Sequence, residues 1–333
     1  MGRTRIVGIV RFSVLSTRPS PFHAYRERTF EEITAAILDE ARLVERFRLF
    51  EAICLPALDG QDDPDFQLLV VAPRLLPPRW KSRLAFLASE RPYVRLHYAD
   101  ETDFLIADCS KIVFDMLETR GLFFTFRLDD DDALARTFVS RARSYLVPPL
   151  AGHGLSFCKG YFFQIRDEAY RISQQIRPNI GAGLGFISSG RTPQTIFDIS
   201  ELHPGLPKRV PVITDATRDS FLVTAHGSND SGKARPVDEA PMSTEQAAKA
   251  LRQLGFTVEL ELLDHLRKMP PPAGSCLELA KTLRGDPLDD LQRGLEGLTK
   301  PTRQQIAARR AGRRQARGWA RSFRDFGRRL LKR

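Results

Sequence analysis

Short apolar runs alternate with amphipathic segments through the first 132 residues. Continuous or alternating apolar positions predict strands at 4–14, 66–72, 93–98 and 122–128. Apolar residues spaced three or four positions apart predict helices between them, at 29–58, 80–87 and 103–118. Short strand–helix connections favour a parallel sheet with helices on both faces. The predicted fold class is therefore α/β, with a doubly wound, mostly parallel sheet and flanking helices.

The pattern is less regular after residue 132. It predicts a helix over 133–146, strands at 154–163, 167–173 and 221–225, and a helix over 243–254. Residues 179–190 are rich in Gly and Ser, which indicates either a flexible segment beside a site or an ordinary loop. We divide the chain into a domain over 1–235, with halves 1–132 and 133–235, a helical or mixed extension over 236–299 and a tail over 300–333.

Composition and charge refine this picture. Hydrophobic residues make up 42% of the chain and include 22 Phe, enough for a sizeable core. The four cysteines are widely spaced and lack zinc-site spacing, so we interpret them as buried thiols in a reducing compartment. The apolar run after Met1 is too short for a signal peptide, and no segment reaches membrane-spanning length without charge or proline. We expect a cytoplasmic protein.

The excess of positive charge lies in the tail. Residues 300–333 contain 13 Lys and Arg against one acid and carry +12, so the other residues carry −2 of the net +10. Four of their apolar residues form one helical stripe: Trp319, Phe323, Phe326 and Leu330. The tail is interpreted as an amphipathic helix in peripheral contact with an anionic membrane face. Packing of the stripe on the body is the next alternative, and a nucleic-acid or protein partner is the least favoured.

Four consecutive carboxylates, Asp129 to Asp132, follow the strand predicted at 122–128. They occupy the carboxyl end of a parallel strand, where ligands bind in open α/β sheets. Carboxylate oxygens suit hard divalent cations such as Mg²⁺ or Mn²⁺, which also bind substrate phosphates. The alternative is a solvated acidic turn that caps the helix predicted at 133–146.

Other motifs narrow the chemistry. Gly181, Gly183 and Gly185 lack the spacing of a dinucleotide-binding loop, and the chain has neither a P-loop nor a GxSxG sequence. His226 follows the strand predicted at 221–225. Alone it is more often a structural histidine, but the acidic run makes it a candidate metal or phosphate ligand.

Three segments resemble one known family: RFRLFEAICLPALDGQDDPDF from Arg46, RLDDDDAL from Arg127 and FLVTAHGSNDS from Phe221. Their content and order are similar to a bacterial rhamnosyltransferase family in the GT-A clan of glycosyltransferases. The resemblance covers roughly residues 5–235, and the LDxDDAL element is its most specific part.

The resemblance implies sugar transfer from a nucleotide-sugar donor to a polysaccharide or lipid-linked acceptor, assisted by Mn²⁺ or Mg²⁺. It assigns nucleotide binding to the half 1–132 and acceptor binding to the half 133–235. The implied metal-site residues are Asp129, Asp131, Asp132 and His226, and the implied nucleotide contacts are Phe12, Ser13, Lys111 and Arg127.

The catalytic base is less defined, because nothing in the spacing of Asp198 or Glu201 separates these two candidates from surface acids. Two other functions stay open from the sequence. Clustered aspartates also serve metal-dependent phosphoryl or nucleotidyl transfer. The second open function is that of a non-enzymatic adaptor, which binds cations or nucleic acid and acts through the basic tail.

Overall fold

A computed structural model describes the part of the chain that carries the predicted domain and the start of the extension. The described residues are 5–15, 29–99, 107–117, 121–166, 169–189, 194–200, 203–227 and 239–268. Glu201, the tail over 300–333 and the side chains of Cys109 and Cys276 lie outside them. Cys54 and Cys158 are buried free thiols, as predicted.

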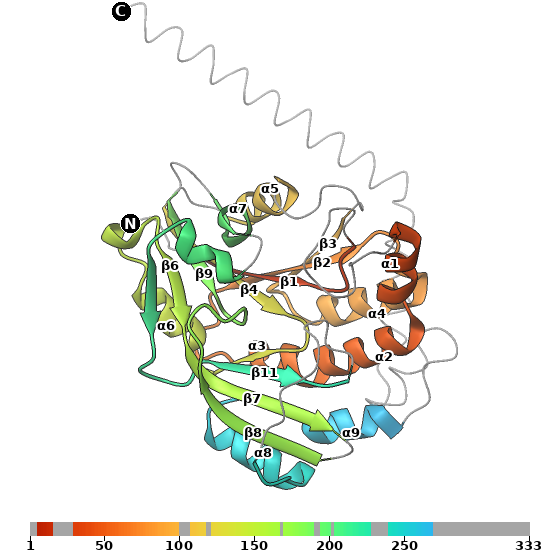
Figure 1. Cartoon of the computed structure of the whole chain (residues 1–333). Helices are drawn as coiled ribbons and strands as arrows, with labels where there is room; N and C mark the ends of the chain where they lie inside the picture. The colour runs from red at the N-terminus through yellow and green to blue at the C-terminus, as the bar shows by residue number, and fades with distance from the viewer. Residues whose placement is uncertain are drawn as a thin grey trace, which may run out of the picture. The chain divides into compact units, whose positions relative to one another are not determined.

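A seven-stranded sheet in the order β10-β6-β9-β4-β1-β2-β3 forms the centre of the domain (Figure 1). Its strands are β1 Arg5–Arg11, β2 Gln67–Pro73, β3 Val94–Ala99, β4 Leu122–Asp129, β6 Gly154–Phe157, β9 Gly185–Ser189 and β10 Val212–Asp215. Strand β9 runs antiparallel to β4 and β6, and the other pairs are parallel. The four strands predicted before residue 129 are confirmed, and so is the mostly parallel sheet.

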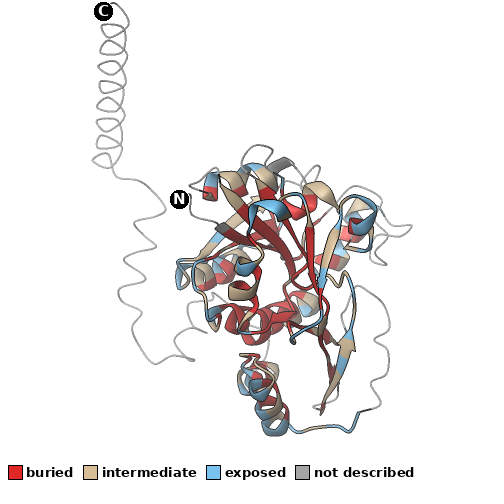
Figure 2. Cartoon of the chain, turned by 90° about the vertical axis from the view of Figure 1, so that its left-hand side faces the viewer, coloured by how far each residue is buried: buried red, intermediate tan, exposed pale blue. Residues whose placement is uncertain are grey.

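Helices cover both faces of this sheet (Figure 1). One face carries α2 Glu40–Leu49, a π-helix over Phe50–Cys54, α3 Leu55–Asp59 and α4 Pro78–Ser89. The other face carries α5 Ala107–Met116 and α7 Ile196–Ile199. Successive strand side chains alternate between the two layers, so Ile6 and Val10 pack on the first and Val7 and Ile9 on the second. Figure 2 shows the strands buried between outer helix surfaces that are partly exposed.

A second sheet, in the order β5-β11-β7-β8, lies beside the first. Its strands are β5 Ala133–Leu134, β7 Lys159–Arg166, β8 Ala169–Ile176 and β11 Phe221–Ala225. Its buried face packs against the π-helix and against α8 Thr244–Gln253 and α9 Leu260–Lys268. The start of the predicted extension therefore shares a hydrophobic core with the domain.

The structure corrects several predicted elements. Residues 133–146 do not form one helix: they contain β5, a turn and α6 Phe138–Ser144, because Leu134 pairs with Phe221 of β11. The Gly-rich segment contains β9, which the sequence pattern missed. A Cβ atom at Gly185 would come within 2.2 Å of the Phe124 ring, so glycine lets β9 approach β4.

The helical stretch predicted at 29–58 is divided. Helix α1, Phe30–Ile37, ends before Asp39, whose carboxylate accepts the backbone N–H of Arg42 and caps α2. The π-helix precedes Pro56, which has no N–H to donate to the carbonyl four residues earlier. That carbonyl, of Ala52, instead accepts the N–H of Glu259 at 2.7 Å, just before α9. None of the described helices is long and apolar enough to cross a membrane.

Candidate functional site

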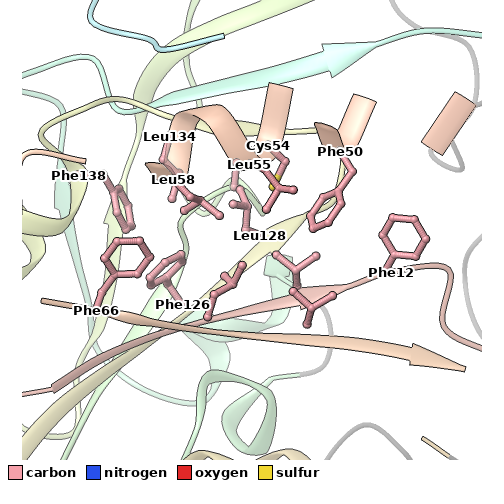
Figure 3. Close-up of a cluster of buried hydrophobic side chains, with 14 of the residues drawn as sticks. Phe12, Phe50, Cys54, Leu55, Leu58, Phe66, Phe126, Leu128, Leu134 and Phe138 are labelled. Atoms are coloured by element: carbon pink, nitrogen blue, oxygen red, sulfur yellow. The ribbon is translucent and has the colours of Figure 1, made fainter. Parts of the chain in front are cut away.

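The acidic run connects the two sheets, since β4 of the large sheet ends at Asp129 and β5 of the small sheet begins at Ala133. Asp130, Asp131 and Asp132 are buried, whereas the Asp129 side chain is 44% exposed. Apolar residues on both sides, Leu128 and Leu134, anchor the run in the core shown in Figure 3. Three of the four carboxylates therefore lie inside the protein, which excludes a solvated acidic turn.

Asp131 and His226 are brought together across 95 positions of the sequence. His226 Nε2 donates to Asp131 Oδ2 at 2.8 Å, and the same oxygen accepts Arg46 Nη1 at 2.8 Å. Burial alone would raise the pKa of Asp131, but Arg46 and His226 overcome it and lower the pKa to about 2. Asp131 is therefore an ionised carboxylate next to an imidazole, at the carboxyl end of a sheet.

Arg46 on α2 is the site residue that the sequence analysis missed. Its Nε atom donates to Asp130 Oδ2 at 3.1 Å, and its Nη2 atom contacts the other oxygen of the same carboxylate. A signal was present: Arg46 lies three residues after Leu43 and four before Phe50, on the apolar stripe of the helix. A charge on a buried stripe indicates a buried partner.

Asp132 has a different environment from Asp131. Its Oδ1 atom accepts the backbone N–H of Thr224 at 2.9 Å and so connects the acidic run to β11, two residues before His226. Burial, followed by the negative charges of Asp131 and Asp129, raises the pKa of Asp132 well above its ordinary value. The structure thus gives Asp132 an anchoring contact, and its role as a metal ligand stays a prediction.

A basic group lies on the other face of the sheet end. Arg11 Nη2 is 3.7 Å from Asp129 Oδ1, and the guanidinium groups of Arg11 and Arg127 lie 5.3 and 5.5 Å from the centre of the Phe197 ring. Burial, followed by the charge of Arg11, lowers the pKa of Arg127 to about 10. Arg127 stays a cation at neutral pH, next to the exposed carboxylate of Asp129.

The other predicted nucleotide contacts are more dispersed. Phe12 is fully buried, with its ring 4.6 Å from Phe47 and 5.3 Å from Phe50. Figure 3 shows Phe12 and Phe50 among the core side chains. Ser13 has a φ of 51° and its hydroxyl accepts Arg42 Nη1 at 3.1 Å. Lys111 is exposed on α5. The Phe12 side chain is thus part of the core, so any contact between Phe12 and a nucleotide must come from its backbone.

Replacing Phe12 with alanine is expected to destabilise the protein by about 3–5 kcal/mol, because the change empties an aromatic site in the core. Urea unfolding measures this free energy. Phe12→Leu is the control: it keeps most of the volume and should cost much less. A Phe12→Ala protein with unchanged stability and weaker nucleotide binding would contradict the core assignment.

Asp198, one of the two candidate bases, caps a helix. Its Oδ2 atom accepts the backbone N–H of Thr195 at 2.6 Å and the Thr195 hydroxyl at 2.9 Å, and also contacts the Ser110 hydroxyl. These bonds close a capping box at the start of α7 and connect it to α5. A base role for Asp198 would therefore have to break this cap, whereas Glu201 lies outside the described residues.

Two side chains of the site, Asp131 and His226, are of the types that bind a divalent cation. Within the described residues no group of three or more His, Cys, Asp or Glu side chains could hold a metal ion. Asp131 offers a carboxylate oxygen, and His226 would offer Nε2 once this nitrogen gives up the proton that it donates to Asp131; both ligand types suit Mn²⁺. Cations of this kind commonly take only one or two protein carboxylates and complete their coordination with phosphate oxygens and water.

Comparison with known proteins identifies the family. The model of the family described as "Putative rhamnosyl transferase" matches residues 5–238. The chain belongs to this family. It is thus a member of a glycosyltransferase family, and the predicted resemblance is confirmed. Among curated proteins, none matches the chain.

Solved structures similar to this glycosyltransferase are distant. TarS from S. aureus is 8% identical over 79% of this chain and 69% of its own, with a TM-score of 0.36. The mannosyltransferase PcManGT from Pyrobaculum calidifontis, solved with GDP-Man and Mn²⁺, is 16% identical over 90% of this chain and 82% of its own, with a TM-score of 0.37.

Replacing His226 with alanine in this family member is expected to weaken Mn²⁺ binding about 10- to 100-fold, because Asp131 would lose the imidazole beside it. Isothermal calorimetry with Mn²⁺ and a nucleoside diphosphate measures the change. His97→Ala is the control, since this histidine lies on edge strand β3, which β1 and β2 separate from β4. Unchanged Mn²⁺ affinity with a large loss of stability would show that His226 is only a core residue.

Proposed function

We propose that this chain is a cation-dependent glycosyltransferase that transfers a sugar from a nucleotide-sugar donor to a glycan or lipid-linked acceptor. The observation that carries the proposal is the pairing of Asp131 with His226 at 2.8 Å, at the carboxyl end of β4. A bound Mn²⁺ or Mg²⁺ would supply positive charge against the diphosphate as it leaves the sugar.

The chain's own residues support binding of a diphosphate. Arg11 and Arg127 are two cations on one side of Asp129, at the end of the sheet where ligands bind in this class of fold. Such fixed cations stabilise phosphate charge without reorganising during the reaction. We assign them to the diphosphate of the donor, and Asp131 and His226 to the cation beside it.

A thermal-shift panel tests this proposal. UDP-, GDP- and dTDP-sugars are each added with Mn²⁺, with Mg²⁺ and with EDTA, and one donor class is expected to raise the melting temperature only when the cation is present. The preferred donor is then used in a transfer assay with membrane lipid extracts and polysaccharide. Equal shifts with EDTA, or shifts with free phosphate alone, would contradict the proposal.

The acceptor part of the proposal includes the membrane. We place the enzyme in the cytoplasm, with the tail over 300–333 at the anionic inner face of the membrane, because this tail carries +12 and one apolar stripe. Each basic residue near such a surface contributes about 1 kcal/mol. Membrane contact would keep the domain close to a lipid-linked acceptor and raise its effective concentration.

Removal of the tail is expected to abolish sedimentation with vesicles that contain anionic lipid, while nucleotide-sugar binding is retained in a chain ending at Lys300. Replacing Trp319 and Phe323 with serine keeps the charge and should still reduce vesicle binding, because the stripe no longer enters the headgroup region. Neutral vesicles are the control for charge. Equal vesicle binding by the shortened chain, or preference of the tail for RNA at physiological salt, would contradict the membrane assignment.

A further inference from the structure

Arg46 has a fixed position inside the site. Its side chain is 8% exposed, and the residues around it on the helix are held by aromatic packing, with the Phe47 ring stacked on Trp80 at 4.6 Å. The C-terminal end of α2 is fixed as well, because the π-helix that follows it packs into two clusters of the hydrophobic core. Arg46 therefore presents its guanidinium to the acidic run from a rigid element.

The guanidinium contacts two carboxylates at once. Its Nε and Nη2 atoms bind Asp130, which has no exposed surface, and its Nη1 atom binds Asp131 Oδ2 at 2.8 Å. Asp130 needs a buried cation, because an unpaired buried carboxylate is costly. Asp131 is buried as well, and its Oδ2 atom accepts His226 Nε2 in addition to Arg46 Nη1. The second contact thus places a permanent positive charge on the carboxylate assigned to the metal.

This contact has a consequence for metal binding. A divalent cation that binds Asp131 shares that carboxylate with Arg46, and the two positive charges repel each other in a region of low dielectric constant. The charge of the nucleoside diphosphate offsets this repulsion when both ligands are present. Cation and diphosphate should therefore favour each other's binding, and by thermodynamic linkage the effect is reciprocal.

We propose that Arg46 is a positioning residue that holds Asp131 toward His226 and acts as an internal counter-cation, so that a divalent cation binds there mainly together with the donor diphosphate. This inference rests on the proposed function and deepens it. Arg46 makes cation binding conditional on the donor, which limits occupation of the site by free metal ions.

Electron paramagnetic resonance of Mn²⁺ tests the inference, with the dissociation constant measured for Mn²⁺ alone and with GDP, UDP or dTDP. In the wild-type protein a nucleoside diphosphate is expected to tighten Mn²⁺ binding at least about 10-fold. In the double variant Arg46→Gln/Asp130→Asn, which removes one charge of each sign, Mn²⁺ alone should bind about 10-fold tighter and the effect of the nucleotide should shrink accordingly. Simple damage to the site would change Mn²⁺ affinity in the opposite direction.

The chain offers a matched control and a conservative variant. Arg83 and Glu51 form another buried pair, with Arg83 Nε donating to Glu51 Oε1 at 2.8 Å, so Arg83→Gln/Glu51→Gln removes a similar pair away from the acidic run. It should leave both Mn²⁺ constants unchanged. Arg46→Lys keeps the charge without the fork and should keep Mn²⁺ binding dependent on the nucleotide.

The outcomes separate the two proposals. A wild-type protein that binds no Mn²⁺ under any condition would overturn the proposed function and this inference with it. A wild-type protein that binds Mn²⁺ equally well with and without nucleotide would overturn the inference alone, even if the double variant does not fold. So would a folded double variant whose two Mn²⁺ constants match those of the wild type.

Discussion

Replacing Asp131 with asparagine is expected to lower sugar-transfer activity by about 100-fold or more and to abolish the dependence of nucleotide binding on Mn²⁺. Asparagine keeps the shape of the side chain, and its amide oxygen can still accept one N–H from His226 or Arg46. The negative charge that would bind the cation is lost. Transfer assays over a range of Mn²⁺ concentrations, with calorimetry of nucleoside diphosphate binding, measure both effects.

Asp215→Asn is the matched control for this substitution. Asp215 is also buried and paired with an arginine, since Arg141 Nη2 donates to its Oδ2 at 2.7 Å, but it lies at the end of edge strand β10. Its loss should reduce stability and leave the Mn²⁺ dependence of nucleotide binding intact. If the two variants lose Mn²⁺-dependent binding equally, general destabilisation explains the result and the assignment of Asp131 fails.

A chain ending at residue 238, where the family match ends, is expected not to fold into a stable protein. Five large apolar side chains of the following segment are buried in the core of the small sheet: Leu251, Phe256, Val258, Leu260 and Leu263. Each contributes about 1.5–3 kcal/mol by burial. Their sum is comparable to the whole free energy of unfolding of a typical domain, about 5–15 kcal/mol.

A chain ending at Ala273 is the control, because it retains α8 and α9 and the whole compact unit over Met1–Ala273. It should unfold cooperatively in urea, whereas the shorter chain should bind a hydrophobic dye and aggregate. Equal unfolding midpoints for the two chains would show that α8 and α9 contribute nothing to the core, against the burial seen here.

The sequence predicts the first half of the fold well and the second half less well. The strands β1, β2 and β4 have apolar runs because both faces are buried, whereas the edge strand β3 alternates between apolar and polar residues, and both patterns are local signals. Strand β9 and the short β5 are set by contacts distant in sequence, such as the approach of Gly185 to Phe124. No local pattern carries that information, so tertiary pairing overrides the helix predicted at 133–146.

The candidate site follows the same division. The sequence shows that Asp131 and His226 each follow an apolar strand, but these strands, β4 and β11, lie in different sheets. The family resemblance, and not adjacency of the strands, therefore suggested that the two residues meet. Phe12 and Asp198 show the limit of assignment by position, since one side chain packs in the core and the other caps α7. Arg46 was visible only as a charge on an apolar stripe, and its two acceptors were defined by the fold.

The carbonyl freed by Pro56 has a consequence for synthesis of the chain on the ribosome. Helix α2 and the π-helix that follows it are synthesised early. The hydrogen-bond donor to the Ala52 carbonyl, the N–H of Glu259, is synthesised more than 200 residues later, and so is Arg267, which forms an ion pair with Glu45. Contacts of such sequence separation form late and slowly. The nascent chain therefore leaves Leu49, Ala52 and Ile53 uncovered by their late partners until α8 and α9 are made, a period in which chaperones would protect this face from aggregation.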